Sequence, residues 1–278
     1  MKLLLLGANG QVGRELRRSL APLGQMVVAT RDGADADAVA DFDAPDDVAA
    51  LVARIAPAVV VNAAAYTAVD QAESDQAAAY RANAETPGAI ARACAANGAL
   101  LVHYSTDYVF DGTGERPYRP DDPTAPLGVY GQSKLAGEDA IRSSGARHAI
   151  LRTAWVYAAH GRNFLLTMLR LAGEREELRV VADQVGAPTP AAWIADATAQ
   201  LLQRGVPEAG TWHLVAGGET SWHGFASAIM EQAQAAGLIA RAPQVLPIAT
   251  RDYPTPARRP AYSVLDTASL ERDFGIVS

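Results

Sequence analysis

Short apolar runs alternate with longer segments of helical periodicity over the first 155 residues. The apolar runs predict buried strands at residues 3–6, 26–29, 58–62, 99–105 and 148–153. They are continuous rather than alternating, which is typical of a sheet covered on both faces. The segments between them predict helices at residues 11–20, 46–55, 77–97 and 129–143. This alternation predicts an α/β fold, namely a Rossmann-like, doubly wound parallel sheet.

Two of these helices carry local signals. Asp43 is a suitable N-cap for the second helix, whose first turn lies next to Pro45. Pro87 is expected to break or kink the third helix, because proline lacks the N–H that a helix interior needs.

The pattern is less regular in the second half of the chain. Helices are predicted at residues 163–172, 191–203 and 222–236, strands at 178–182 and 211–215, and an extended, ordered loop in the proline-dense segment 243–260. We expect a dinucleotide-binding domain over residues 1–158, completed by roughly residues 190–218. A smaller substrate-binding domain would then comprise residues 159–189 and 219–278.

Composition narrows the class of protein. With 49% hydrophobic and 20% charged residues among 278, the chain has the composition of a globular protein. A net charge of −7 disfavours nucleic acid as a partner, and the single cysteine, Cys94, excludes an internal disulfide. No apolar run reaches membrane-spanning length, and the first one is too short for a signal peptide, so we expect no membrane association and a cytoplasmic location.

A glycine-rich turn follows the first predicted strand and opens the first helix. Gly7, Gly10 and Gly13 have the spacing G-x-x-G-x-x-G. In dinucleotide-binding folds such glycines allow a tight turn and let backbone N–H groups approach a pyrophosphate. An ordinary strand–helix turn is the weaker interpretation.

The end of the second predicted strand bears on the choice of cofactor. Arg31 stands where an acidic residue would bind an adenosine ribose, and an arginine there can hold a 2′-phosphate. This favours NADPH, with NADH possible, since Asp32 is adjacent and Arg31 can also be an ordinary solvated side chain. Asp41 and Phe42 are placed to line an adenine pocket, and the acidic segment 32–47 is interpreted as a solvated loop and helix start rather than a metal site.

Catalytic chemistry is indicated by Tyr130 and Lys134, which form Y-x-x-x-K on a predicted helix. The chain has only two lysines, Lys2 and Lys134, among 24 basic residues. Side chains four residues apart share a helix face, and a cation there is expected to lower the pKa of the tyrosine. The same ammonium can donate to ribose hydroxyl groups.

Polar residues at two predicted strand ends complete this candidate site. Thr106 follows the fourth strand, where its hydroxyl can hold a substrate carbonyl beside Tyr130. Asn62 ends the third strand and is expected to border the cofactor. His103, inside the apolar fourth strand, is interpreted as a buried, hydrogen-bonded imidazole.

Several longer motifs, spread over most of the chain, resemble those of a known family and occur in the same order. They are Asn62-Ala-Ala-Ala-Tyr-Thr-Ala-Val-Asp70, Ser105-Thr-Asp-Tyr-Val-Phe-Asp-Gly112, Val129-Tyr-Gly131, Arg152-Thr-Ala-Trp-Val-Tyr157 and Asp183-Gln-Val-Gly-Ala-Pro-Thr189. With the glycine turn and Tyr130…Lys134, the chain resembles the dTDP-4-dehydrorhamnose reductase family of extended short-chain dehydrogenases/reductases.

The resemblance implies NADPH-dependent reduction of the C4 ketone of dTDP-4-dehydro-β-L-rhamnose to dTDP-β-L-rhamnose, the last step of the synthesis of this sugar nucleotide. By this analogy Tyr130 protonates the developing alkoxide, Lys134 tunes Tyr130 and binds the ribose, and Thr106 positions the ketone. Asp107 and Trp155 would contact the sugar together with Thr106 and Tyr130. The implied cofactor-binding residues are Gly7, Asn9, Gly10, Gln11, Val12, Gly13, Arg31, Asp41, Phe42, Ala63, Ala64, Ala65, Tyr66, Thr67, Tyr104, Tyr130 and Lys134.

The chain departs from the family in two respects. Some relatives bridge two subunits through carboxylates and Mg²⁺; Glu15 matches one such ligand, but Ala191 and Ala192 offer none, so we expect no metal and leave monomer or homodimer open. The chain also ends at Ser278, just after Phe274, whereas relatives usually continue into a final helix, so we expect the last piece of the substrate-binding domain to be short or absent.

Other interpretations remain open. A sugar-nucleotide dehydratase or epimerase is disfavoured because Tyr108 replaces the glutamate that dehydratases of this type need. A non-catalytic binding subunit, resembling the regulatory subunit of methionine adenosyltransferase, is disfavoured by the intact Thr106, Tyr130 and Lys134. Arg258 and Arg259 are equally consistent with gripping a diphosphate and with a solvent-exposed pair.

Overall fold

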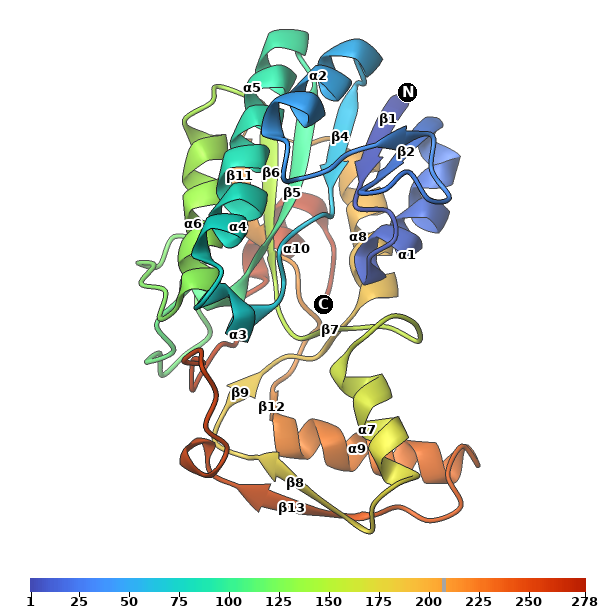
Figure 1. Cartoon of the computed structure of the whole chain (residues 1–278), viewed down its shortest axis with the longest axis vertical. Helices are drawn as coiled ribbons and strands as arrows, with labels where there is room; N and C mark the ends of the chain where they lie inside the picture. Colours follow the sequence, from blue (N-terminus) through green and yellow to red (C-terminus); the bar gives the residue numbers. More distant parts are fainter. Residues whose placement is uncertain (207–208) are drawn as a thin grey trace.

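A seven-stranded parallel sheet dominates the computed structural model, which describes residues 1–206 and 209–278 (Figure 1). Its strands are β1 (Lys2–Leu6), β2 (Gln25–Thr30), β3 (Ala38–Val39), β4 (Val59–Asn62), β5 (Leu100–Thr106), β6 (His148–Thr153) and β11 (Ala209–His213). Their spatial order is β11-β6-β5-β4-β1-β2-β3. The order reverses between β1 and β4, and such a switch point is where open α/β sheets bind ligands. The predicted doubly wound sheet is therefore confirmed.

Helices cover both faces of this sheet (Figure 1). One face packs against α1 (Gln11–Leu20) and α8 (Ala191–Arg204), and the other against α2 (Pro45–Ile55), α5 (Thr86–Asn97) and α6 (Val129–Arg142). Alternate leucines of β1 enter the two cores, and all are fully buried. Each such burial contributes about 2 kcal/mol to stability, which explains why these strands are apolar on both faces.

The region expected to form one long helix is divided into three pieces. α4 (Gln76–Tyr80) leads into a π-helical turn at Arg81–Glu85, and α5 begins at Thr86 with Pro87 in its first turn. A proline in a first turn costs no hydrogen bond, because that N–H has no partner there. The backbone stays helical up to and beyond Pro87, so the chain is not broken there; the irregularity takes the form of the π-helical turn before it. A single short turn, α3 (Val69–Ala72), precedes α4.

Parts of the second half of the chain form a smaller layer below the sheet (Figure 1). Strands β8 (Glu177–Val181) and β13 (Gln244–Ile248) pair in parallel and pack against α7 (Phe164–Ala172) and α9 (Trp222–Ala235). Two-residue strands join the layers, namely β7 (Val156–Tyr157) with β10 (Thr189–Pro190) and β9 (Val185–Gly186) with β12 (Thr220–Ser221). The last described helix is α10 (Ala268–Phe274).

Three sequence expectations are corrected by the structure. The segment 243–260 is not all loop, because β13 lies within it; Pro247 is accommodated in a two-stranded pair that leaves one edge free. The acidic segment 32–47 contains the short strand β3 in addition to the expected loop and helix start. Asp43 does not cap α2, which begins at Pro45 after Ala44; its carboxylate pairs with Arg31 instead.

Gly13 is required where α1 crosses the end of β1. A Cβ at Gly13 would lie 2.1 Å from the Gly7 carbonyl oxygen and 2.8 Å from the Ala8 Cα. We expect Gly13→Ala to lower the free energy of unfolding by about 3 kcal/mol, measured by urea denaturation. Gly10→Ala is the matched control, because its Cβ would meet nothing closer than 3.4 Å, and a change of less than about 1 kcal/mol is expected. Equal losses in both variants would contradict this packing argument.

Candidate active site

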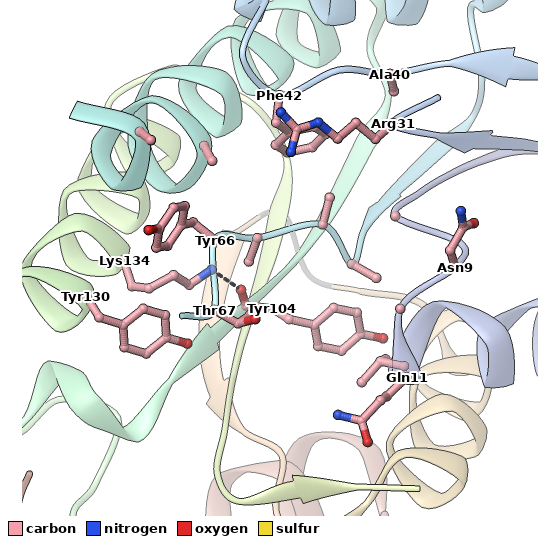
Figure 2. A pocket seen from close by; sticks show the side chains of 18 of the residues that line it. Asn9, Gln11, Arg31, Ala40, Phe42, Tyr66, Thr67, Tyr104, Tyr130 and Lys134 are labelled. Carbon is pink, nitrogen blue, oxygen red and sulfur yellow. Dashed lines mark hydrogen bonds between the residues drawn. The ribbon is translucent and has the colours of Figure 1, made fainter. Parts of the chain in front are cut away.

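A cavity of about 670 Å³ opens at the carboxyl ends of the sheet strands (Figure 2). Of the seventeen residues expected to bind cofactor, all except Gly13 line it. Gly13 instead allows α1 to pack on the turn. The lining residues that the sequence did not indicate are Thr30, Ala40, Asp43, Gln71, Asp75, Ala78, Ala82, Ser105, Thr153 and Val156. Thr153 and Ser105 follow the same strand-end rule that identified Thr106, so that signal was present in the sequence.

The glycine turn shapes one end of the cavity. Gly7 has φ +77°, and a Cβ there would lie 2.5 Å from the Ala64 backbone nitrogen, in the segment that follows β4. Gly10 precedes α1 and supplies no side-chain cap. The first N–H groups of α1 are thus left for another partner, and their partial positive charge suits a phosphate.

Arg31 lines the same cavity and lies among carboxylates. Its guanidinium pairs with Asp43 and, at 3.3 Å, with Asp41, and its side chain is 73% exposed. Arg81 also approaches Asp43, at 3.5 Å. The arginine is free to turn towards a ligand, because exposed ion pairs of this kind contribute little stability.

Tyr130 and Lys134 extend from α6 towards the middle of the cavity (Figure 2). Burial raises the pKa of Tyr130 to about 12; the Thr106 hydroxyl opposes this increase and the charge of Asp107 adds to it. Burial lowers the pKa of Lys134 to about 8, and the charge of the nearby Glu138 carboxylate partly opposes this decrease. Lys134 Nζ donates to the Tyr104 carbonyl oxygen at 2.7 Å. The expected lowering of the Tyr130 pKa by Lys134 is therefore not what this structure shows, because burial dominates and the ammonium is held by β5.

Helix α6 is fixed to the sheet by a buried ion pair. Glu138 is fully buried, and its two carboxylate oxygens accept from Arg152 of β6 at 2.9 and 2.8 Å. Arg152 also donates to the Pro120 carbonyl oxygen at 3.0 Å. Removing one partner of such a pair leaves an uncompensated charge, so the pair sets the place of the helix that carries Tyr130 and Lys134.

Thr106 and Asp107 lie at the carboxyl end of β5, beside Tyr130 but outside the lining of the main cavity. The Thr106 hydroxyl donates to Asp107 Oδ1 at 3.0 Å and accepts from the Tyr108 N–H at 3.2 Å. Asp107 Oδ2 is buried without a partner among the described residues. Burial raises the pKa of Asp107 to about 6, and the nearby hydroxyl groups of Ser263 and Thr106 partly offset this increase. An unpaired buried carboxylate oxygen is costly and indicates a place for a ligand donor.

Trp155 is also outside the cavity lining and has a strained backbone. Its φ is +46°, a conformation that is rare for a bulky residue, and its indole stacks on that of Trp222, with ring centroids 3.5 Å apart. Gly186 leaves room for this indole, since a Cβ there would lie 2.6 Å from the ring. Backbone strain of this kind is typical of functional positions. The partnership with Trp222, 67 residues along the chain, carried no sequence signal.

Arg259 joins the last part of the chain to the first layer. Its guanidinium pairs with Asp70, at 2.8 and 3.1 Å, and the same carboxylate accepts from the Ala257 N–H. Arg258 is exposed. Arg259 is therefore not solvent-exposed, which was one of the two interpretations of this residue. Its guanidinium is already bound to the Asp70 carboxylate.

Two further findings concern the described residues as a whole. No group of three or more histidine, cysteine or acidic side chains in residues 1–206 and 209–278 is arranged to hold a metal ion. Within the same ranges, no helix combines the length and apolarity that crossing a bilayer requires.

The fold and the site together define a class of protein. A doubly wound sheet with a glycine turn, and a Tyr-x-x-x-Lys pair facing the cavity at its switch point, are the features of a short-chain dehydrogenase/reductase.

Comparisons with known proteins identify the family within this class. The family model described as "RmlD substrate binding domain" matches residues 1–278. The chain is 52% identical to a dTDP-4-dehydrorhamnose reductase of Burkholderia thailandensis, over 99% of this chain and 94% of that protein, and 48% identical to that of Escherichia coli K12, over 100% and 93%. The crystal structure of a Bacillus anthracis dTDP-4-dehydrorhamnose reductase in complex with NADP superposes with a TM-score of 0.89 at 35% identity, covering 98% of this chain and 92% of that one. The chain belongs to the dTDP-4-dehydrorhamnose reductase family.

The raised pKa of Asp107 gives a stability prediction. Its carboxyl stays protonated in the folded protein up to about pH 6 and ionises near pH 4 when unfolded, so stability falls as pH rises through this window. We expect Asp107→Asn to raise the free energy of unfolding by about 3 kcal/mol at pH 7.5, with little difference from the parent at pH 4. Urea denaturation of both proteins between pH 4 and 8 measures this. A difference that stays constant over that range would contradict the prediction.

Proposed function

We propose that this chain reduces the C4 ketone of dTDP-4-dehydro-β-L-rhamnose to the alcohol of dTDP-β-L-rhamnose, consuming NADPH and one proton and releasing NADP⁺. The observation that carries the proposal is that Tyr130 and Lys134 both line the cavity that the glycine turn opens. The proposal rests also on the names of the relatives, which agree over the whole chain.

The residues present fit a bound dinucleotide. Gly7 and Gly13 shape the cradle, α1 offers its uncapped N-terminus to the pyrophosphate, and Arg31 is placed for a 2′-phosphate. When bound, the nicotinamide supplies a hydride to the ketone carbon. The choice of NADPH over NADH depends on Arg31 exchanging Asp41 and Asp43 for the phosphate, since phosphate carries the larger charge.

Proton transfer is assigned to Tyr130. A pKa of about 12 keeps its hydroxyl protonated at neutral pH, as a group that donates a proton to a developing alkoxide must be. The Lys134 ammonium stabilises the phenolate left behind and donates to ribose hydroxyls. Thr106 then orients the ketone oxygen beside Tyr130.

The sugar is proposed to bind on the side of Thr106, Asp107 and Trp155. Asp107 has an unsatisfied acceptor, which suits a sugar hydroxyl, and Trp155 offers an apolar ring face. The smaller layer, residues 159–189 and 219–278, is the proposed substrate-binding domain, and residues 1–158 with 190–218 form the proposed nucleotide domain; residues 207 and 208 lie outside the described part. We place the enzyme in the cytoplasm, as a monomer or homodimer.

The same proposal separates this chain from its two alternatives. A dehydratase needs an acid on the sugar ring at position 108, and Tyr108 there packs edge-on against Tyr130 with ring centroids 5.5 Å apart. A non-catalytic binding subunit would not turn over alone. The test is therefore NADPH oxidation by the purified chain, with the keto sugar generated in place from dTDP-glucose by the upstream enzymes. Formation of dTDP-rhamnose supports the proposal, and cofactor binding without consumption would contradict it.

Removing the Tyr130 hydroxyl separates chemistry from binding. We expect Tyr130→Phe to lower kcat by about 10³-fold, because the proton donor is lost, while the NADPH Kd changes less than about threefold. Steady-state kinetics and fluorescence titration measure the two effects. Tyr80→Phe, outside the cavity lining, is the matched control and should keep near-parental kcat. Comparable kcat values for the parent and Tyr130→Phe would remove Tyr130 from this role.

Arg31 is tested by comparing the two nicotinamide cofactors. We expect Arg31→Ala to weaken NADPH binding by about tenfold, since a charge-assisted contact with the 2′-phosphate is lost. Binding of NADH, which lacks this phosphate, should change less than about threefold and serves as the internal control. Equal losses for NADPH and NADH would show that Arg31 does not recognise the 2′-phosphate.

A further inference from the structure

A buried histidine lies directly behind Lys134. His103, on β5, is fully buried; its Nε2 is 3.3 Å from Lys134 Nζ and its Nδ1 is 3.0 Å from Asn62 Nδ2. The expectation of a buried, hydrogen-bonded imidazole at His103 is confirmed. Asn62 is also buried and is not among the cavity lining residues, so the expectation that it borders the cofactor is corrected. Three adjacent elements, β4, β5 and α6, thus contribute one polar chain of three side chains.

The orientation of the Asn62 amide follows from its backbone partner. Asn62 Oδ1 accepts from the Ala64 N–H at 3.1 Å, so the amide nitrogen is the atom that faces His103. An amide nitrogen only donates, and Nδ1 of His103 must therefore accept. Burial lowers the pKa of His103 well below its ordinary value, with the Lys134 charge adding to the effect, so the ring is neutral. A neutral imidazole that accepts at Nδ1 carries its proton on Nε2.

This tautomer determines whether His103 can accept a hydrogen bond from Lys134. The ammonium has three N–H donors and no acceptor, and the Nε2–H of His103 is a donor as well. The imidazole therefore gives the ammonium no acceptor. Among the described residues, the Tyr104 carbonyl oxygen is the one hydrogen-bond acceptor of Lys134, at 2.7 Å. Two of its three donors remain unused, although the side chain is buried.

The charged groups around Lys134 do not take up these donors. Glu138, one turn along α6, is occupied by Arg152 of β6 and by Arg142 at 2.6 Å. Tyr130, on the same helix, is protonated at neutral pH. His103 of β5 is the remaining titratable group in contact with the amine.

We propose that Asn62 and His103 are positioning residues for Lys134: the amide fixes the imidazole with its Nε2–H towards the amine, and two ammonium donors are thereby kept for hydroxyl groups of a ligand in the cavity. The inference rests on the role of Lys134 in the proposed reductase. Its geometry is nevertheless testable without substrate or turnover.

The tautomer is measured directly in the full chain. Long-range ¹⁵N–¹H NMR spectra distinguish protonated from unprotonated imidazole nitrogens, and the chain has five histidines, so that His103→Phe assigns the signal by difference. The expected result at pH 7 is a protonated Nε2 and an unprotonated Nδ1. The opposite tautomer, or a doubly protonated ring, would overturn the inference. The tautomer is read from the parent chain, and where His103→Phe fails to fold, substitution of each of the other four histidines assigns the signal by elimination.

The effect on Lys134 is measured by titrating its ¹³Cε signal. The chain contains two lysines, and the exposed hydrogen bond of Lys2 to the Ile55 carbonyl makes Lys2 an internal reference. We expect His103→Phe to raise the titration midpoint of Lys134 by about one pH unit, because the donor that opposes the ammonium is removed. If Nε2 instead accepted from the ammonium, the same variant would lower the midpoint. A lowered or unchanged midpoint would therefore overturn the inference.

A matched substitution controls for the loss of a buried imidazole. His148 is buried on β6, where it lies in register with Leu101 of β5, and its Nδ1 is bonded to the Ala146 carbonyl oxygen. His148→Phe should leave the Lys134 midpoint unchanged, and a shift equal to that of His103→Phe would overturn the inference. Failure of the proposed function is detected separately. In that case the parent chain does not oxidise NADPH, while the titration midpoint of Lys134 and the tautomer of His103 are still as expected.

Discussion

The buried ion pair between Glu138 and Arg152 is the constraint on which the candidate site depends. It joins α6 to β6 inside the protein, where neither charge can exchange its partner for water. The register of α6 against the sheet then places Tyr130 and Lys134 at the carboxyl ends of β5 and β6. A buried pair of this kind adds little net stability but penalises every alternative position of the helix. Specific placement of the two side chains follows from that penalty.

The nucleotide end and the reactive end of the cavity are built on different principles. Around Gly7 and Gly13 the cavity wall consists of backbone atoms, and the chain can adopt this conformation only where these residues have no side chain. Around Tyr130 the surface consists of side chains whose protonation is set by burial. Desolvation acts in opposite directions on the two groups: it keeps the tyrosine neutral and makes the lysine easier to discharge.

The fold and most of the cavity lining could be predicted from sequence because they depend on local patterns. Apolar runs locate the strands, and ligands bind at strand ends, so Arg31 follows from the order of elements, whereas positions such as Ala65 and Tyr104 were implied by the family resemblance. The stack of Trp155 on Trp222 and the pairing of Arg259 with Asp70 join residues distant in sequence, and no local pattern encodes them. The pKa of Tyr130 was misjudged because spacing shows which charge is near, whereas burial depends on the whole fold.

The contact of Arg259 with Asp70 spans 189 positions of the chain, and this has a consequence for synthesis. Domains fold in order as the chain emerges, and the strands β1 to β6 are complete by Thr153. The nucleotide cradle can therefore assemble on the ribosome well before Arg259 has been translated. Helix α3, which carries Asp70, acquires this partner only when almost the entire polypeptide has been made, so the link between the first layer and the late segment cannot form before then.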